Sequence, residues 1–245
     1  MITLIDTQQS NISSVANMLK RIGVAARIAQ SPADVLGASK VILPGVGHFA
    51  TVMAWLNQSG YRAALDTAVL GQKTPILGIC LGMQLMAKHS EEGDCDGLGW
   101  IDATVREFRD VAPLPVPHMG WDEVAFAPAS PFANGYAEQV PPPGGGRLGG
   151  GLIGTADNIP GSTLESPPPQ PSPSGGGSEP PRFYFVHSYY VTCAEKSDVL
   201  GTTHYGHDFV SAFARGNVVG AQFHPEKSHA FGMRFLKAFA EEFHG

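Results

Sequence analysis

The stretch TPILGICLGMQLMAKHS, residues 74–90, places a cysteine between two glycines where an apolar strand gives way to a helix. A strand-to-helix turn of the form Gly-x-Cys-x-Gly holds its central residue, Cys80, in a strained and exposed position. The flanking glycines let neighbouring backbone pass without a Cβ clash, and the N-terminus of the following helix favours a thiolate. These residues therefore indicate a nucleophile, although a buried cysteine beside incidental glycines fits them as well.

Strands and helices alternate through the first half of the chain, around this turn. The segment that begins at Asn11 predicts an amphipathic helix, because its apolar residues recur on one face and Gly23 then stops it. Apolar strands of this length between helices are typical of a largely parallel sheet with helices on both faces. We expect strands at 1–6, 25–30, 40–45 and 75–79, and further helices at 49–58 and 61–71.

Short strands joined by tight turns, some of them hairpins, are expected in the second half of the chain. The chain closes with an amphipathic helix over 230–243, whose phenylalanine and leucine side chains fit a packed core better than a ligand site. The expected strands are 99–108, 118–126, 182–191, 199–205, 209–215 and 218–224.

Residues 141–181 differ in composition from the rest of the chain. They hold 11 of the 20 prolines and 11 of the 30 glycines. Because proline removes backbone donors and glycine raises the entropy cost of ordering, this stretch is unsuited to a packed core. We predict one domain over residues 1–245 that carries 141–181 as a disordered surface insert; a role in docking a partner is the alternative.

The net charge and the cysteine content narrow the class of protein. The 245 residues carry a formal charge of −6, which argues against nucleic acid or an anionic membrane as partner, since both attract basic patches. The first residues read as neither a signal peptide nor a membrane span, so we expect a cytoplasmic protein. Three cysteines cannot all pair, and the histidines are scattered, so we expect no disulfide framework, no metal and no cofactor.

The sequence AQFHPEKS, residues 221–228, supplies a base for the cysteine. His224 and Glu226 lie two positions apart at the end of an apolar strand, so both side chains point the same way in an extended chain. A sulfur nucleophile, an imidazole that carries the proton and a carboxylate that fixes the imidazole form a catalytic triad. A lone His-Pro-Glu is an ordinary turn in most proteins, but together with the turn at Cys80 it indicates this chemistry.

A third motif, ILPGVGHF at residues 42–49, ends another strand in a tight loop whose backbone amides are free to face a ligand. An ordinary strand-to-helix turn fits this loop equally well. The other two cysteines, Cys95 and Cys193, are expected to lack a glycine elbow, and we interpret them as structural or incidental.

The motifs PILGICLGMQLM and GAQFHPEKS together resemble the class I (triad) glutamine amidotransferases. Within that family, LPGVGHF, VPHMGWDEV and FYFVHSYYV are similar to the glutaminase subunits of imidazole glycerol phosphate synthase. The resemblance covers nearly all of the chain outside the insert and implies a three-layer, flavodoxin-like α/β fold around a mostly parallel sheet. The chain departs from the family in the insert and in its first loop, DTQQSNISSV, which in the family is usually glycine-rich.

The resemblance also implies a role for particular residues. Cys80 would be the nucleophile, His224 the general base and acid, and Glu226 the residue that orients the imidazole. The backbone amides of Val46 and Leu81 would form the oxyanion hole. The residues that would surround bound glutamine are Gly47, Gln84, Glu92, Tyr184, Ser188 and Tyr189. Those that would contact a partner subunit are His118, Met119 and Trp121, although packing in a core explains these three as well.

The implied reaction is hydrolysis of glutamine to glutamate and ammonia. The family would pass the ammonia to a (β/α)8-barrel synthase subunit in a heterodimer, which makes imidazole glycerol phosphate and an aminoimidazole carboxamide ribotide in histidine biosynthesis. Two alternatives remain open. One is another class I amidotransferase or a γ-glutamyl hydrolase with the same triad, and the other is a catalytically silent, amidotransferase-like regulatory module.

Overall fold

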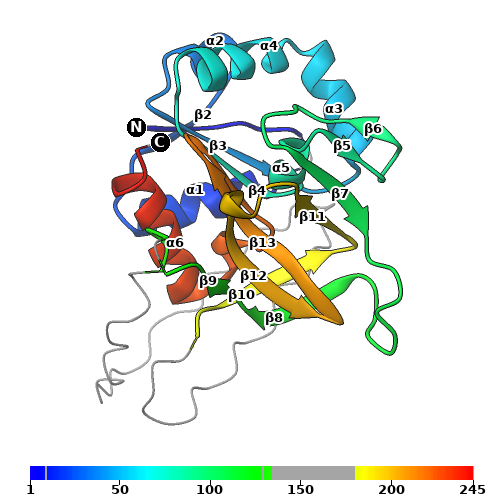
Figure 1. Ribbon diagram of the computed structural model, residues 1–245. Coiled ribbons are helices and arrows are strands. Elements are labelled where there is room, and N and C mark those ends of the chain that lie inside the picture. Colours follow the sequence, from blue (N-terminus) through cyan, green and yellow to red (C-terminus); the bar gives the residue numbers. More distant parts are fainter. Residues whose placement is uncertain (9, 129, 134–179, 245) are drawn as a thin grey trace, which may run out of the picture.

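The central feature of the fold is a twelve-stranded sheet with helices on both faces, seen in the computed structural model (Figure 1). The structure describes residues 1–8, 10–128, 130–133 and 180–244. The predicted disordered insert is 141–181, and 141–179 lie outside the described residues, so the insert stays a prediction. The single domain over 1–245 also stays a prediction.

Five parallel strands form the half of the sheet that carries the turn at Cys80, in the order β2-β1-β3-β4-β14. The last of these comes from the far end of the chain and pairs with β4, so that Ala221 lies opposite Ile79. This register brings the segment that follows β14 beside the end of β4. The bounds are β1 (Ile2–Leu4), β2 (Ala26–Ile28), β3 (Lys40–Gly45), β4 (Ile76–Cys80) and β14 (Val218–Ala221).

The other half of the sheet is mostly antiparallel and continues from β14 in the order β13-β11-β7-β5-β6, with β12 beside β13 and β9 beside β12. Two further strands, β8 and β10, form a small antiparallel sheet of their own. The bounds are β5 (His89–Ser90), β6 (Cys95–Asp96), β7 (Ala103–Glu107), β8 (His118–Glu123), β9 (Ala125–Phe126), β10 (Arg182–His187), β11 (Tyr189–Cys193), β12 (Val199–Tyr205) and β13 (His207–Arg215).

Two expected strands are wrong. The segment 118–126 breaks at Val124 into β8 and β9, because β8 pairs with β10 in the small sheet whereas β9 pairs with β12 in the large one. The segment 182–191 does not run as a single strand but breaks at Ser188 into β10 and β11, which belong to different sheets. The physical reason is tertiary, because β10 finds its hydrogen-bond partner in β8 whereas β11 lies between β7 and β13.

Helices cover both faces of the sheet and complete the expected three layers, with α2, α3 and α4 on one side and α1 and α6 on the other (Figure 1). The expected helix after Asn11 is confirmed as α1. The bounds are α1 (Ile12–Arg21), α2 (Ala33–Leu36), α3 (Phe49–Gln58), α4 (Tyr61–Asp66), a π turn (Thr67–Gly71), α5 (Leu81–Leu85), 3-10 turns at Lys196–Asp198 and Pro225–Lys227, and α6 (His229–Glu241).

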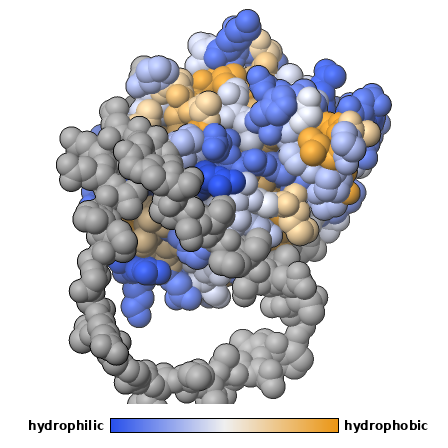
Figure 2. Space-filling model, turned by 90° about the horizontal axis from the view of Figure 1, so that it is seen from below, coloured by the Kyte–Doolittle hydropathy of each residue, from blue (hydrophilic) through white to orange (hydrophobic). Residues whose placement is uncertain are grey.

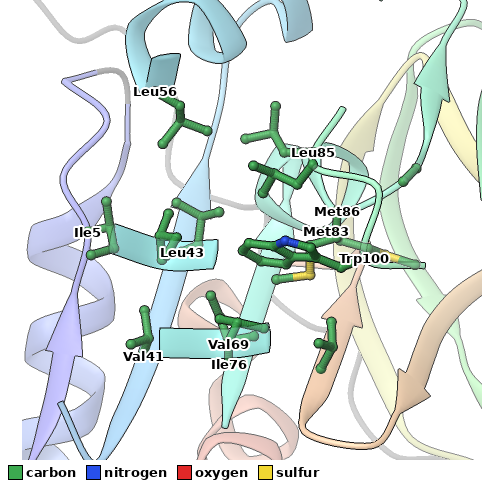
Figure 3. Close-up of a cluster of buried hydrophobic side chains, with 14 of the residues drawn as sticks. Ile5, Val41, Leu43, Leu56, Val69, Ile76, Met83, Leu85, Met86 and Trp100 are labelled. Atoms are coloured by element: carbon green, nitrogen blue, oxygen red, sulfur yellow. The ribbon is translucent and has the colours of Figure 1, made fainter. Parts of the chain in front are cut away.

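Alternating side chains of the central strands supply both cores. In β3, Val41 and Leu43 join the cluster beneath α3 and α4, whereas Ile42 joins the cluster beneath α1 and α6. Figure 3 shows the first cluster, in which Val41 and Leu43 lie near Ile76 of the next strand. Burial on both faces explains why these strands are apolar without alternation.

Among the described residues, no helix is both long enough and apolar enough to span a membrane. On the face in Figure 2, apolar residues lie in separate patches among hydrophilic ones.

Lys40, at the start of β3, holds the C-terminal helix to the sheet. Its ammonium donates hydrogen bonds to the carbonyls of Phe239, Ala240 and Phe243 at 2.8, 2.8 and 2.6 Å. These carbonyls at the end of α6 have no partner within the helix, so a cation there satisfies them and meets the negative end of the helix dipole.

We expect Lys40→Met to lower the free energy of unfolding by about 2–3 kcal/mol, because it keeps the aliphatic stem but removes charged hydrogen bonds. Urea denaturation measures this loss. Lys237→Met is the matched control, because that side chain is exposed and its ion pair with Glu241 is long, at 3.9 Å, so about 0.5 kcal/mol or less should be lost. Equal losses in the two variants would show that Lys40 does not anchor the helix.

Candidate active site

Cys80 lies at the turn where β4 ends and α5 begins. Its backbone has φ 54° and ψ −112°, a conformation that costs a non-glycine residue about 1–3 kcal/mol and that clusters at functional sites. The structure therefore has the strained strand-to-helix turn that the Gly-x-Cys-x-Gly pattern predicts. The expected exposure of Cys80 is wrong, because the residue is 6% exposed, packs in the cluster beneath α1 and α6, and has its sulfur 3.9 Å from the carbonyl of Val186.

The two glycines of the pattern are required by close packing. A Cβ on Gly82 would lie 1.8 Å from the carbonyl oxygen of Leu43, and a Cβ on Gly78 would lie 2.6 Å from the carbonyl group of Gly82. The start of α5 is thus pressed directly against β3, and the backbone around Cys80 has little freedom to move.

Cys95 corrects one expectation. The residues Gly93 to Gly97 also have the Gly-x-Cys-x-Gly spacing, so glycine spacing alone does not distinguish Cys95 from Cys80. The structure makes the distinction, because Cys95 lies in β6, in a short antiparallel pair with β5, and is not followed by a helix. Cys193 lies in β11, and burial, followed by the nearby charge of Asp198, raises the pKa of its thiol to about 12, which keeps it protonated.

His224 and Glu226 form a buried pair. Nδ1 of His224 donates to Oε1 of Glu226 at 2.8 Å, and the two residues are 2% and 8% exposed. The backbone of His224 is held as well. Its amide donates to the carbonyl of Tyr184 at 2.9 Å, and its carbonyl accepts from the hydroxyl of Ser228 at 2.6 Å. The remaining ring nitrogen, Nε2, is buried without a hydrogen bond of good geometry within the described structure.

The charges around His224 favour its imidazolium form. Burial alone lowers the pKa of this side chain, but the Glu226 carboxylate and then the negative charge of Cys80 outweigh burial and raise it to about 10. The register of β14 on β4, with Ala221 opposite Ile79, brings the segment that carries His224 beside the end of β4, where Cys80 lies. The structure thus brings the nucleophile, the base and the carboxylate of the predicted triad together.

A cavity of about 280 Å³ opens beside the sulfur. It is slightly smaller than the pockets of about 300–1,000 Å³ that hold drug-sized ligands, which suits a small molecule such as an amino acid. Its lining includes the predicted residues Val46, Gly47, Cys80, Leu81, Gln84, Glu92, Ser188 and Tyr189, together with Val186 and His187, which we did not predict.

Tyr184 is the exception among the predicted glutamine contacts, because it is not part of this lining. It lies in β10, where its ring packs 6.1 Å from the ring of Trp121 and beneath the ammonium of Lys227. The interruption of the strand at Ser188 separates Tyr184 from Tyr189, which lies in β11.

Two polar side chains in the cavity are held in fixed orientations. Glu92 accepts a hydrogen bond from the backbone amide of Phe49 at 2.8 Å, at the first turn of α3. Gln84 uses both amide hydrogens, donating to the carbonyl of Tyr189 at 2.9 Å and to the side-chain oxygen of Gln222 at 3.0 Å. Glu92 can therefore bind a cationic group of a ligand, and Gln84 offers it an acceptor oxygen.

His187 forms a neutral part of the cavity wall. Burial, followed by the charge of His118, lowers the pKa of His187 to about 3. Its Nδ1 donates to the carbonyl of Tyr189 at 2.8 Å, so its Nε2 accepts from Nδ1 of His118 at 3.1 Å. Nε2 of His118 in turn lies 2.7 Å from the carboxylate of Asp122.

The three predicted partner contacts differ in exposure. Met119 is 60% exposed, whereas His118 is 1% and Trp121 is 9% exposed. The indole of Trp121 stacks on the ring of His229, with 5.3 Å between centroids and 6° between planes. In this chain, then, Met119 is the member of the three that presents a large side chain outward.

Gln222 is the polar neighbour of Cys80 that the sequence reasoning missed. Its Nε2 lies 3.7 Å from the sulfur, and the side chain is fully buried. The signal in the sequence is the spacing of two positions between Gln222 and His224, which puts both on one side of an extended segment. Glu226 lies beyond that segment, in the 3-10 turn Pro225–Lys227.

Comparison with known proteins agrees with this geometry. The family model for class-I glutamine amidotransferases matches residues 3–136. A crystal structure of a glutamine amidotransferase shares the fold with a TM-score of 0.65 at 16% identity, covering 98% of this chain and 97% of that one. PurLQS from Thermotoga maritima has a TM-score of 0.62 at 13% identity, covering 97% of this chain and 96% of that one. The chain therefore belongs to the class-I glutamine amidotransferase family.

More similar relatives narrow the family further. Imidazole glycerol phosphate synthase subunit HisH 2 of Methanococcus maripaludis is 38% identical, over 99% of this chain and all of the relative. Subunit HisH of Bdellovibrio bacteriovorus is 38% identical, over 98% of this chain and all of the relative. Subunit HisH 2 of Pseudomonas aeruginosa is 39% identical, over 98% of this chain and 99% of the relative. Within the family, the chain belongs with the HisH subunits of imidazole glycerol phosphate synthase.

Proposed function

We propose that Cys80, His224 and Glu226 hydrolyse the side-chain amide of glutamine to glutamate and ammonia, as the glutaminase of an imidazole glycerol phosphate synthase in histidine biosynthesis. The observation that carries the proposal is the buried His224–Glu226 pair beside the strained turn at Cys80, where a cavity sized for an amino acid opens. The HisH relatives support this choice of reaction over the wider family.

The geometry suits a two-step reaction. The Cys80 thiolate attacks the amide carbonyl of glutamine, and the His224 imidazolium gives its Nε2 proton to the nitrogen as the C–N bond breaks and ammonia leaves. The neutral imidazole then takes a proton from water, whose oxygen attacks the glutamyl thioester. The C–S bond breaks, glutamate is released, and the thiolate and imidazolium are restored.

Two backbone amides serve the oxyanion that forms on the carbonyl. Leu81 is the first residue of α5, so its N–H has no partner within the helix. Val46 lines both the cavity at Cys80 and a smaller one lined by His224 and Glu226, which supports this role for its amide. Each such donor contributes about 3 kcal/mol to the transition state.

The cavity provides complementary contacts for the amino-acid end of glutamine. The Glu92 carboxylate receives the α-ammonium group, and the side-chain oxygen of Gln84 accepts a further hydrogen bond. Gly47 has φ 96°, which lets the loop expose its backbone to the ligand at no steric cost. Ser188 and Tyr189 complete the wall opposite.

The ammonia requires a second subunit. Ammonia released into water near neutral pH is protonated and loses its nucleophilic lone pair, so an enclosed path to the acceptor is needed. The relatives are named as subunits of a synthase, and this chain pairs with a (β/α)8-barrel synthase subunit as a heterodimer, with Met119 and the surrounding β8 at the contact.

Reconstitution tests the function. The chain, co-purified with a barrel synthase subunit, should form imidazole glycerol phosphate from the ribotide substrate with glutamine as nitrogen source. Turnover of γ-glutamyl peptides in place of glutamine would instead identify a γ-glutamyl hydrolase. Absence of a covalent adduct on Cys80 after treatment with a glutamine-analogue electrophile would identify a silent regulatory module.

Glu226→Gln tests the orienting carboxylate. The glutaminase kcat should fall by about 10⁴-fold, as in other triads that lose this charge. The high-pH limb of the activity profile should move to lower pH, because the carboxylate that raises the pKa of His224 is gone. Glu241→Gln, on the exposed face of α6, is the control and should behave as wild type.

The same pair affects stability with a defined sign. Because the pKa of His224 in the folded chain, about 10, lies above its ordinary 6.5, the pair stabilises the fold fully below about pH 6.5 and loses this effect as the pH rises toward 10. The stability difference between wild type and Glu226→Gln should follow that course. A difference that grew with rising pH would contradict the assignment.

A further inference from the structure

A chain of hydrogen bonds between two buried amides reaches the sulfur of Cys80. It begins at the carbonyl of Tyr189, which accepts from Nε2 of Gln84 at 2.9 Å. The same nitrogen donates to Oε1 of Gln222 at 3.0 Å, and Nε2 of Gln222 then lies 3.7 Å from the sulfur. Gln84 is 4% exposed and Gln222 is fully buried, so water does not compete for these contacts.

The orientation of each amide follows from the first bond. A backbone carbonyl only accepts, so Gln84 must present its nitrogen to Tyr189. The second hydrogen of that nitrogen requires an acceptor, so Gln222 must present its oxygen. The nitrogen of Gln222 is therefore on the side of Cys80, and turning either amide over would place two acceptors or two donors against each other.

The two polar neighbours of the sulfur act in opposite directions. The carbonyl of Val186, 3.9 Å away, accepts from the thiol and therefore stabilises the protonated form. The amide of Gln222 donates, so its interaction strengthens when the sulfur is negatively charged. Gln222 comes from the segment that also supplies His224, so one strand end provides both the base and a donor to the nucleophile.

We propose that Gln222 is a catalytic residue that stabilises the Cys80 thiolate and fixes the position of its sulfur, with Gln84 as a positioning residue that sets the Gln222 amide. This inference rests on the proposed role of Cys80 as the nucleophile. It adds a second task for Gln84, which so far was assigned only a contact with glutamine.

The test is alkylation of Cys80 by iodoacetamide without glutamine, followed by mass spectrometry of the peptide that contains it, over a range of pH. Gln222→Met keeps the length of the side chain but removes the donor. Near pH 7 the alkylation rate of Cys80 in this variant should fall about tenfold, equivalent to roughly 1.4 kcal/mol. The midpoint of the plot of alkylation rate against pH should move to higher pH. The glutaminase kcat should fall by a similar factor while KM stays unchanged.

Two further variants separate this role from packing. Gln84→Met should lower the alkylation rate by less than Gln222→Met, and the double variant should react no more slowly than Gln222→Met alone, because Gln84 acts on the sulfur through Gln222. Asn217→Leu removes another buried amide, at the opposite end of β4 from Cys80, and should leave the alkylation profile unchanged even where it lowers stability.

A folded Gln222→Met that alkylates with the wild-type pH profile overturns the proposal, whether or not its kcat falls, because a merely structural role would leave the sulfur as reactive as before. Should Gln222→Met not fold, the Gln84→Met profile decides in the same way. Failure of the nucleophile itself is distinguishable, since glutaminase activity would then survive in Cys80→Ala.

Discussion

Cys80→Ala should abolish glutamine-dependent synthesis by the complex while leaving ammonia-dependent synthesis at the wild-type rate. The substitution removes the only atom that forms the thioester in the proposed reaction, and loss of a triad nucleophile costs about 10⁶-fold in kcat. In the proposed complex free ammonia bypasses this chain, because the synthase reaction is assigned there to the partner subunit. The measurement is product formation by the reconstituted complex with glutamine or with an ammonium salt.

Cys95→Ala is the matched control, because it removes a thiol with the same glycine spacing that lies away from the strand-to-helix turn. It should retain both activities. If Cys80→Ala lost both activities equally in a complex that still assembles, the role of Cys80 would be structural and the proposed mechanism would be wrong.

Gly82→Ala should cause a large loss of stability. The added Cβ would lie 1.8 Å from the carbonyl oxygen of Leu43, which belongs to the backbone of a buried strand and cannot move aside alone. We expect the free energy of unfolding to fall by at least about 3 kcal/mol, together with loss of glutaminase activity, since α5 must shift away from β3.

Gly37→Ala provides the control for this prediction. A Cβ there meets nothing within 4 Å, and its φ of −99° suits any residue. Its stability in urea should change by about 0.5 kcal/mol or less. A Gly82→Ala variant as stable as Gly37→Ala would show that the turn is not tightly packed against β3.

The first half of the fold follows closely from local sequence. β4 and α1 were predictable because burial on two faces leaves an unbroken apolar run in a strand, and burial on one face leaves a periodic pattern in a helix. The break at Ser188 was not predictable, because the segment has strand character throughout and only its different partners, β8 and β7, divide it.

The candidate site also has a part that the sequence predicts and a part that it does not. The Gly-x-Cys-x-Gly pattern does not by itself separate Cys80 from Cys95, and only the context of strand and helix does so. Tyr184 lies outside the cavity lining, because the strand breaks at Ser188 and puts Tyr184 in another sheet than Tyr189. Gln222 was overlooked because a buried amide gains a chemical role only from what it touches.

By itself, the sequence determined which reactive groups this protein has and the backbone that carries each of them, because strand, turn and helix preferences act over a few residues. Only the tertiary structure decided that the groups meet. The pairing of β14 with β4 brings the segment that carries His224 beside the turn that carries Cys80, and it arises from burying two apolar strands that are far apart in the chain. Which strand β14 pairs with depends on burial of the whole core, so no short stretch of residues determines it.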